Sequence, residues 1–176
     1  MKKSIRTLVI LSVMTIIVLA SAICANAATD KKYTIKLANG KTTTVEGHFE
    51  TKLADQIMKD TNSYRKSKKL NTLTSTSALK KISETRAIEA SYKFSHTRPC
   101  GKKCFSISSK LRGENLASGY TTSEAVMKAW KASKSHNKNL TYKTFKTLSV
   151  SVFAKKNVSK SGRVSYTYYI AQRFGK

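Results

Sequence analysis

The sequence predicts an α+β domain, and three observations support this fold class. From residue 51 to about residue 94, apolar residues recur at three- and four-residue steps, which is the period of an amphipathic helix. From residue 148 to residue 174, apolar and polar residues alternate, which is the period of a strand with one buried face. A shorter alternating stretch at 33–45 predicts a hairpin at the start of the domain. Helices followed by strands favour a layered α+β arrangement.

The N-terminal hairpin is expected to close with a tight primed turn at Asn39-Gly40, because these residues accept the positive φ angles that such a turn needs. We therefore expect residues 28–50 to form a β-hairpin extension and residues 51–176 to form the main domain. The first helix is expected from Thr51 to about Ser67. Its inward stripe consists of Leu53, Ala54, Ile57, Met58, Thr61 and Tyr64.

The second helix is expected over residues 77–94, and Pro99 prevents continuation beyond it. Residues 111–117 are expected to form a loop. The third helix is expected to begin at Thr121, where Glu124 completes a capping box. Its inward stripe, which His136 extends, consists of Ala125, Val126, Ala129, Trp130 and Ser133. Two strands then follow at 148–154 and 164–170.

The N-terminus has the pattern of a signal peptide over residues 1–27. A basic start is followed by an apolar run from Leu8 to Ala22, and Ala25-Asn26-Ala27 offers small residues at the spacing of a cleavage site. The alternative interpretation is an uncleaved membrane anchor, but the apolar run is short for a bilayer span. We therefore expect a secreted protein.

Basic residues dominate the charge. The chain has 34 Lys and Arg against 9 Asp and Glu, and three of the basic residues lie in 1–27, so the rest carries a net charge of +22. Such an excess attracts polyanions through a long-range field. Export favours an anionic cell-wall polymer or a lipid surface as partner over nucleic acid, and no stacking aromatic residues are interleaved with the basic ones. The plainer interpretation is a basic surface that keeps the protein soluble.

Two cysteines, Cys100 and Cys104, remain outside the predicted signal peptide. In a secreted protein, two cysteines four residues apart most simply form one small disulfide. The alternative is a metal site that uses both sulfurs together with His96.

Six short motifs follow one another along residues 52–175. They are Asn62–Arg65, Arg86–Glu89, Phe94–Pro99, Gly113–Ala117, Ala129–Ser133 with His136-Asn137, and Tyr169–Gly175. Their order resembles the CAP superfamily, and within it the bacterial SCP-like extracellular proteins. The resemblance implies a three-layer α-β-α sandwich around a central antiparallel sheet, the CAP fold.

The resemblance also implies a cleft lined by two histidines and two glutamates, in which some members bind a divalent metal such as zinc. His96, Glu114 and His136 match three of these four positions. The fourth position, three residues after Trp130, is a glutamate in animal and plant members and is Ser133 here. We therefore expect weak to moderate zinc binding, with room for water at the metal.

A second interpretation gives both histidines a structural role, in which they hydrogen-bond loop backbone and Glu114 and hold the loops together. Glu89 and Arg98 are expected to form a structural ion pair. The sequence shows no separate general base, and no acid is placed to orient His136 toward Ser133 as in a serine hydrolase. We therefore expect a secreted, cell-envelope-associated binding protein rather than an enzyme. A metal-assisted, protease-like hydrolase is the alternative.

Overall fold

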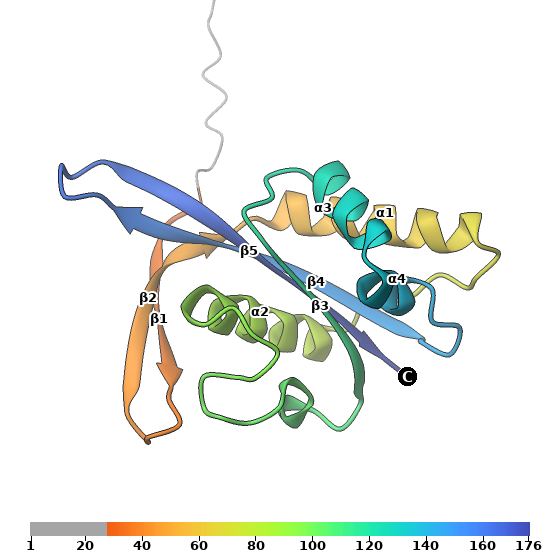
Figure 1. Ribbon diagram of the computed structural model, residues 1–176, viewed down its shortest axis with the longest axis horizontal. Coiled ribbons are helices and arrows are strands. Elements are labelled where there is room, and N and C mark those ends of the chain that lie inside the picture. Colours follow the sequence, from red (N-terminus) through yellow and green to blue (C-terminus); the bar gives the residue numbers. More distant parts are fainter. Residues whose placement is uncertain (1–27) are drawn as a thin grey trace, which may run out of the picture.

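A computed structural model describes the fold of residues 28–176 (Figure 1). The predicted signal peptide, residues 1–27, lies outside the described residues. Within them the elements are β1 (Lys31–Lys36), β2 (Thr42–Phe49), α1 (Thr51–Ser67), α2 (Ser77–Tyr92), the 3-10 helix η1 (Cys104–Ile107), β3 (Leu111–Ser118), α3 (Ser123–Ala132), α4 (Lys134–Leu140), β4 (Thr147–Val158) and β5 (Val164–Gly175). The first helix has the predicted bounds, and the second ends two residues earlier than predicted. None of the described helices has the length and apolarity needed to cross a bilayer.

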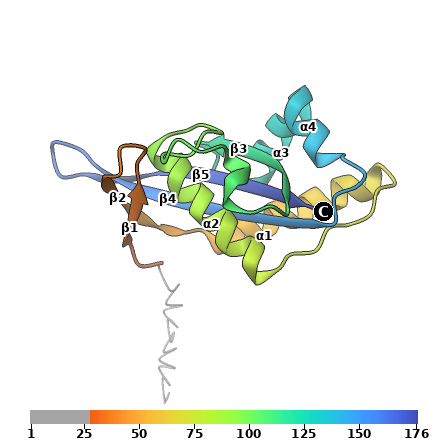
Figure 2. The same ribbon diagram turned by 90° about the horizontal axis from the view of Figure 1, so that it is seen from below.

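Five strands form one antiparallel sheet in the order β1-β2-β4-β5-β3. Figure 1 shows the strands running between two groups of helices, with α1, α3 and α4 on one side and α2 on the other. The predicted three-layer α-β-α sandwich is thus confirmed. The central strands β4 and β5 have 12 residues each. Their connecting turn projects past β1 and β2 in both ribbon views (Figures 1 and 2).

Alternation along the strands divides the core between the two faces of the sheet. The larger cluster lies against α1 and α3 and includes Ile57, Val126, Trp130, Val150 and Ile170. The smaller cluster lies against α2 and the N-terminal hairpin and includes Ile35, Val45, Ala87, Phe153 and Ala171. Each large aliphatic side chain buried in this way contributes about 1.5–3 kcal/mol. Trp130 is a core residue whose Nε1 donates to the Leu116 carbonyl at 3.3 Å.

The N-terminal hairpin closes with a three-residue turn, so the prediction of a two-residue primed turn is wrong. Leu37 N–H donates to Lys41 O at 2.8 Å, and within this turn only Gly40 has a positive φ, +78°. This is the type I turn followed by a left-handed residue that is common in three-residue hairpins. The hairpin also continues the central sheet, because Gly47–Phe49 pair with Phe153–Lys155 of β4.

Residues 111–117 form strand β3, so the prediction of a loop there is wrong. The strand pairs with β5 over most of its length. Its sequence has the polar pair Glu114 and Asn115 at its centre, and both are buried. Asn115 satisfies its amide inside the protein by donating from Nδ2 to Gln172 Oε1 at 2.9 Å. Polar residues that are satisfied internally remove the apolar alternation by which a strand is recognised.

The third helix begins one residue later than predicted, because Thr122 and not Thr121 is its N-cap. The Thr122 side chain accepts from the Ala125 N–H at 3.3 Å. The helix ends at Ala132, and Ser133 has an extended backbone that starts the separate helix α4. His136 therefore lies on α4 and does not continue the stripe of α3.

Two polar side chains of α1 fix the segments that follow it. Asn62 pairs with both backbone groups of Leu73, at 2.9 and 2.8 Å. Arg65 is fully buried and donates from Nε to Asn71 O at 2.8 Å and from Nη1 to Leu140 O at 2.9 Å. These bonds hold the loop after α1 and the end of α4 against the same helix.

Candidate functional site

Four charged side chains meet in the interior between α2 and the sheet. The inward face of α2 carries Arg86 and Glu89, β3 contributes Glu114, and β5 contributes Arg173, which lies opposite Glu114 in the strand register. Both arginines have no exposed surface, and Glu114 is 5% exposed. Because buried charges are tolerated only when they are paired and hydrogen-bonded, these residues must satisfy one another.

The Glu114 carboxylate accepts from three cationic side chains. Its Oε2 accepts from Arg86 Nε at 2.9 Å and from Arg173 Nη1, and its Oε1 lies 2.7 Å from His96 Nδ1. Burial alone would raise the pKa of Glu114. Hydrogen bonds from His96 and Arg86, together with the charge of Arg173, lower that pKa to about 2 instead. The carboxylate is therefore ionised at any ordinary pH.

Arg86 connects this carboxylate to a second one. Its Nη1 donates to Glu89 Oε2 at 2.6 Å, and its Nη2 donates to Ser95 O at 2.9 Å. Arg98, from the loop after α2, donates to Glu89 Oε1 at 2.7 Å, so Glu89 and Arg98 form an ion pair. We call six residues the charge centre, namely Arg86, Glu89, His96, Arg98, Glu114 and Arg173.

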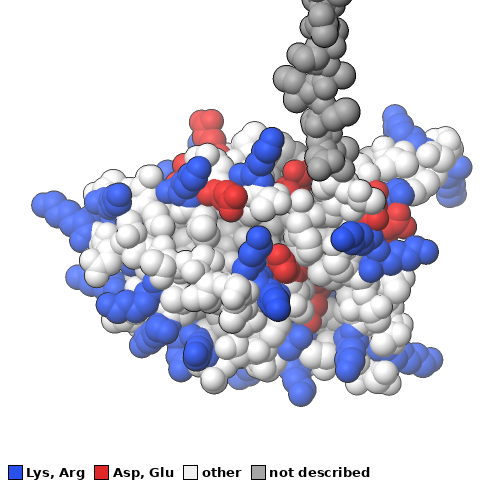
Figure 3. Space-filling model, turned by 180° about the vertical axis from the view of Figure 1, so that it is seen from behind, with Lys and Arg blue, Asp and Glu red and all other residues white. Residues whose placement is uncertain are grey.

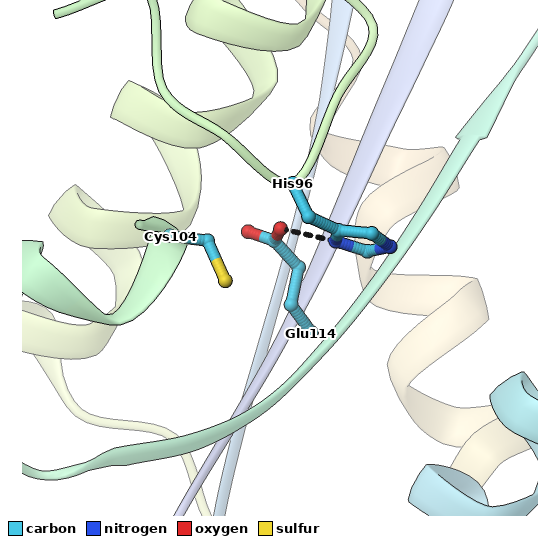
Figure 4. A group of neighbouring side chains, drawn as sticks. All are labelled: His96, Cys104 and Glu114. Carbon is cyan, nitrogen blue, oxygen red and sulfur yellow. Dashed lines mark hydrogen bonds and ion pairs between the residues drawn. The ribbon is translucent and has the colours of Figure 1, made fainter. Parts of the chain in front are cut away.

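His96 and Cys104 flank Glu114 from two separate segments, the loop after α2 and helix η1 (Figure 4). A ring nitrogen, the sulfur and a carboxylate oxygen of these three residues lie within 4.8 Å of one another. The His96 side chain is 59% exposed, whereas Cys104 is 5% exposed. Cys104 and the Glu114 carboxylate raise the pKa of His96 to about 9, so the imidazole is protonated at neutral pH.

His136 lies on α4, outside this group but near enough to His96 to be affected by its charge. Its ring centroid is 6.5 Å from that of Trp130, and it lines a cleft of about 370 Å³. We call this the aromatic cleft, and its main lining residues are Phe94, Tyr120, Trp130, Ser133 and His136. Burial and the nearby charge of His96 lower the pKa of His136, which is therefore neutral at pH 7.

The structure brings together only part of the predicted metal site. Among the described residues, the group of His, Cys, Asp and Glu side chains close enough to share a metal comprises His96, Cys104 and Glu114, and it does not include His136. Ser133 lies in the aromatic cleft beside His136, where its hydroxyl is 3.3 Å from that of Ser135.

The predicted disulfide is absent, because Cys100 and Cys104 are free thiols in the described structure. The cause is a tight turn that the spacing alone does not reveal. Thr97 and Lys103 form a β-bridge, and Arg98 N–H donates to Lys102 O at 2.8 Å. Cys100 therefore lies at the tip of this turn and Cys104 lies beyond its base. The alternative site of both sulfurs and one histidine is only partly formed, since Cys100 takes no part in it.

The sequence prediction missed the two arginines that surround Glu114. A signal for each was present, because Arg86 lies on the inward stripe of a helix and Arg173 lies within the alternating pattern of a strand. A long cation at a core position indicates a buried ion pair. The sequence does not, however, show which carboxylate is its partner.

The profile of the CAP family, the cysteine-rich secretory protein family, matches residues 58–174. The chain belongs to this family. All six residues of the charge centre, together with His136, lie within the matched range. No curated protein sequence matches the chain.

Three solved structures that resemble this CAP domain are bacterial. An extracellular protein containing an SCP domain from Bacillus anthracis has a TM-score of 0.58 and 21% identity, over 72% of this chain and 41% of that one. An outer surface protein from Borrelia burgdorferi has a TM-score of 0.54 and 23% identity, over 74% and 98%. A cysteine-rich secretory protein from Staphylococcus aureus has a TM-score of 0.53 and 19% identity, over 72% and 39%. This chain thus spans less than half of the first and third proteins, and these identities show similarity of fold alone.

The charge centre is a poor fit for a divalent metal. The nitrogen of His96 and the sulfur of Cys104 are donors that suit zinc. The Glu114 carboxylate, however, already accepts from Arg86 and Arg173, and both guanidinium groups are fully buried. A divalent cation would lie beside two positive charges that cannot move to solvent, at a depth where repulsion is weakly screened. The arrangement favours a structural role for the cluster.

Proposed function

We propose that this CAP-domain protein is secreted and binds an anionic polymer of the cell envelope through its basic surface, without catalysing a reaction. The observation that supports the proposal most directly is the distribution of charge over the folded domain. The net charge of +22 outside residues 1–27 creates a field that attracts polyanions before contact.

Several of the few carboxylates are already engaged within the protein. Glu89 and Glu114 are buried in the charge centre. At the surface, Asp30 lies 2.7 Å from His48, and Glu46 lies 2.6 Å from Lys156. Figure 3 shows Lys and Arg side chains all around one face, with acidic groups mainly across its upper and central part. Most lysines are therefore available to an external anion.

The aromatic cleft gives such a polymer a second kind of contact. Phe94 is 53% exposed and Tyr120 is half-buried beside it, while His136 contributes a neutral ring. Aromatic faces with a few polar groups suit the ring of a sugar unit, which has apolar faces and polar edges. The cleft thus complements the lysines, which suit phosphate or carboxylate groups.

Secretion is supported by the signal-peptide pattern of residues 1–27 and by the descriptions of similar structures. One of those proteins is described as extracellular and another as an outer surface protein. Wall polymers and lipid headgroups are both anionic in that compartment, and we favour the polymer because of the sugar-sized aromatic cleft.

The charge centre favours binding over hydrolysis. A metal-assisted hydrolase needs a metal with an open position and a base that can take a proton from water. Glu114 is held by two arginines, and the pKa of His96 at about 9 leaves its imidazole protonated at neutral pH. Cys104 is buried, so its thiol is not available to a substrate as a nucleophile.

The proposal is tested by binding of residues 28–176 to poly(glycerol phosphate) beads over a salt series, with phosphatidylglycerol vesicles as a second probe. We expect retention on the beads at low salt and release near 1 M salt, where the Debye length is about 3 Å. Neutralising Lys68, Lys69, Lys102 and Lys103 to Gln should lower the salt needed for release. The control Glu124→Gln should not lower it. Retention that persists in 1 M salt, or binding to the vesicles alone, would contradict the proposal.

A further inference from the structure

Part of the central strand β4 has an open edge on the side away from β5. β2 covers this edge only at Phe153–Lys155, and Thr74 bridges it at Thr147. Leu148 N–H donates to Thr74 O at 2.9 Å, and Val152 O accepts from Glu50 N–H at 3.0 Å. These bonds show that the even-numbered residues of β4 turn their backbone groups toward this side.

Val150 lies between those two bonds. Within residues 28–176, neither its N–H nor its C=O has a hydrogen-bond partner on this side, and the same holds for the Val152 N–H and the Leu148 C=O. Four backbone groups of one strand are thus left in a row without a partner. An unpaired edge of this kind is a template for another strand.

A pocket of about 250 Å³ gives access to this edge. Its floor is Ser149–Val152, one wall is formed by Ala54 and Met58 of α1, and the opposite wall is formed by Lys80 and Glu84 of α2. The pocket is a slot between the two helical layers, with the strand edge at its base.

The slot is acidic on a protein that is otherwise strongly basic. Glu50, Asp55 and Glu84 line it against a single cation, Lys80. In the part of the chain that the structure describes, Asp55 and Glu84 form no ion pair. Three of the nine carboxylates of the chain are therefore gathered around unpaired backbone groups.

We propose that this slot binds an extended, lysine- or arginine-bearing peptide segment of a partner protein, which adds to the edge of β4 as a short strand. Main-chain hydrogen bonds to Val150 and Val152 would supply affinity, as in other cases of strand addition. Successive side chains of a strand point to opposite sides, so apolar ones contact Ala54 and Met58 while basic ones reach Glu84. This slot is separate from the basic surface, and it favours a cationic partner, whereas the basic surface favours an anionic one.

The first test changes only the ligand, so that the protein cannot misfold. The probe is the peptide Lys-Val-Lys-Val-Lys with blocked ends, and its binding to residues 28–176 is measured by calorimetry. Two isomers carry two N-methyl groups each, on the first and third residues or on the second and fourth, and only one of these sets can face β4. We expect one isomer to bind like the parent peptide and the other to bind at least tenfold more weakly. Equal binding of both isomers, or of Glu-Val-Glu-Val-Glu, would overturn the proposal.

The second test locates the site on the protein. The double variant Asp55→Asn with Glu84→Gln should weaken binding of the peptide by about 2- to 30-fold, because two exposed charge pairs contribute that much to affinity. The matched control Glu124→Gln lies on α3, away from the slot, and should have no effect. Hydrogen exchange of the Val150 and Val152 amides should slow when the peptide is bound. An equal loss in the control, or unchanged exchange at Val150, would show attraction by overall charge and refute strand addition.

Discussion

Replacing Glu114 by Gln tests the charge centre most directly. The substitution keeps the shape of the side chain and one acceptor oxygen, but it removes the charge that two buried guanidinium groups share. Arg86 retains Glu89 at 2.6 Å. Arg173 retains only the Cys104 carbonyl at 3.1 Å and the ring of Phe105 at 5.5 Å. Arg173 is thus the cation that loses its counter-charge.

Breaking a buried ion pair by removing one partner costs about 3–5 kcal/mol. Because Arg86 keeps a carboxylate, we expect Glu114→Gln to cost about 3 kcal/mol, at the lower end of that range. For a domain of this size, 1 kcal/mol shifts Tm by about 2–4 °C, so Tm should fall by about 6–12 °C. Urea and thermal unfolding followed by circular dichroism at pH 7 measure both quantities.

The double variant Glu114→Gln with Arg173→Met distinguishes an uncompensated charge from a packing defect. It removes the cation that the single variant leaves unpaired, so it should be more stable than Glu114→Gln alone. The exposed control Glu124→Gln should change stability by less than about 0.5 kcal/mol. A loss below about 1 kcal/mol for Glu114→Gln, or additive losses in the double variant, would refute the reasoning.

Three further predictions concern other parts of the domain. The pKa of His96 is raised from 6.5 to about 9, so its stabilising contribution is complete below pH 6.5 and is lost as the pH rises through 9. Because the side chain is 59% exposed, solvent screening reduces this contribution to about 1 kcal/mol. Urea unfolding over a pH series should show this loss of stability in the wild type but not in His96→Asn. Gly47→Ala should lower the free energy of unfolding by about 1–3 kcal/mol in the same assay, because the added methyl group would meet the Ala154 carbonyl oxygen. An unchanged free energy of unfolding would mean that β2 can shift away from β4. Iodoacetamide should label the partly exposed Cys100 in the native protein and the buried Cys104 only after unfolding, and mass spectrometry measures both. If neither cysteine reacts in denaturant, the two form the disulfide instead.

The elements that the sequence predicted well are those with a long amphipathic pattern. Helix α1 and the strands β4 and β5 each turn one apolar face to the core, and periodicity detects such a face. Strand β3 escaped detection because it is buried on both faces and carries Glu114 and Asn115 at its centre. Its polar residues are satisfied by partners that are distant in sequence, and no local window contains those partners.

The same limit explains what could be predicted of the candidate site. The motifs indicated that His96 and Glu114 belong to one place, and the two do lie 2.7 Å apart. Glu114 also pairs with Arg173. This contact depends on the β3–β5 register, which joins residues 59 positions apart. Register follows from the packing of the whole sheet, so the arginines that make the centre structural could not be assigned from the sequence.

The strand order also determines when this protein can fold. Apart from the local β1–β2 hairpin, every pairing in the sheet involves β4 or β5, which are the last two elements of the chain. A nascent chain that lacks them has no partner for β3, and α2 lacks most of the sheet surface on which it packs. Assembly of the sheet must therefore wait for β4 and β5, and the many distant pairings make it slow. A chain that stays unfolded until β4 and β5 are available would meet the export proposed above in an unfolded form.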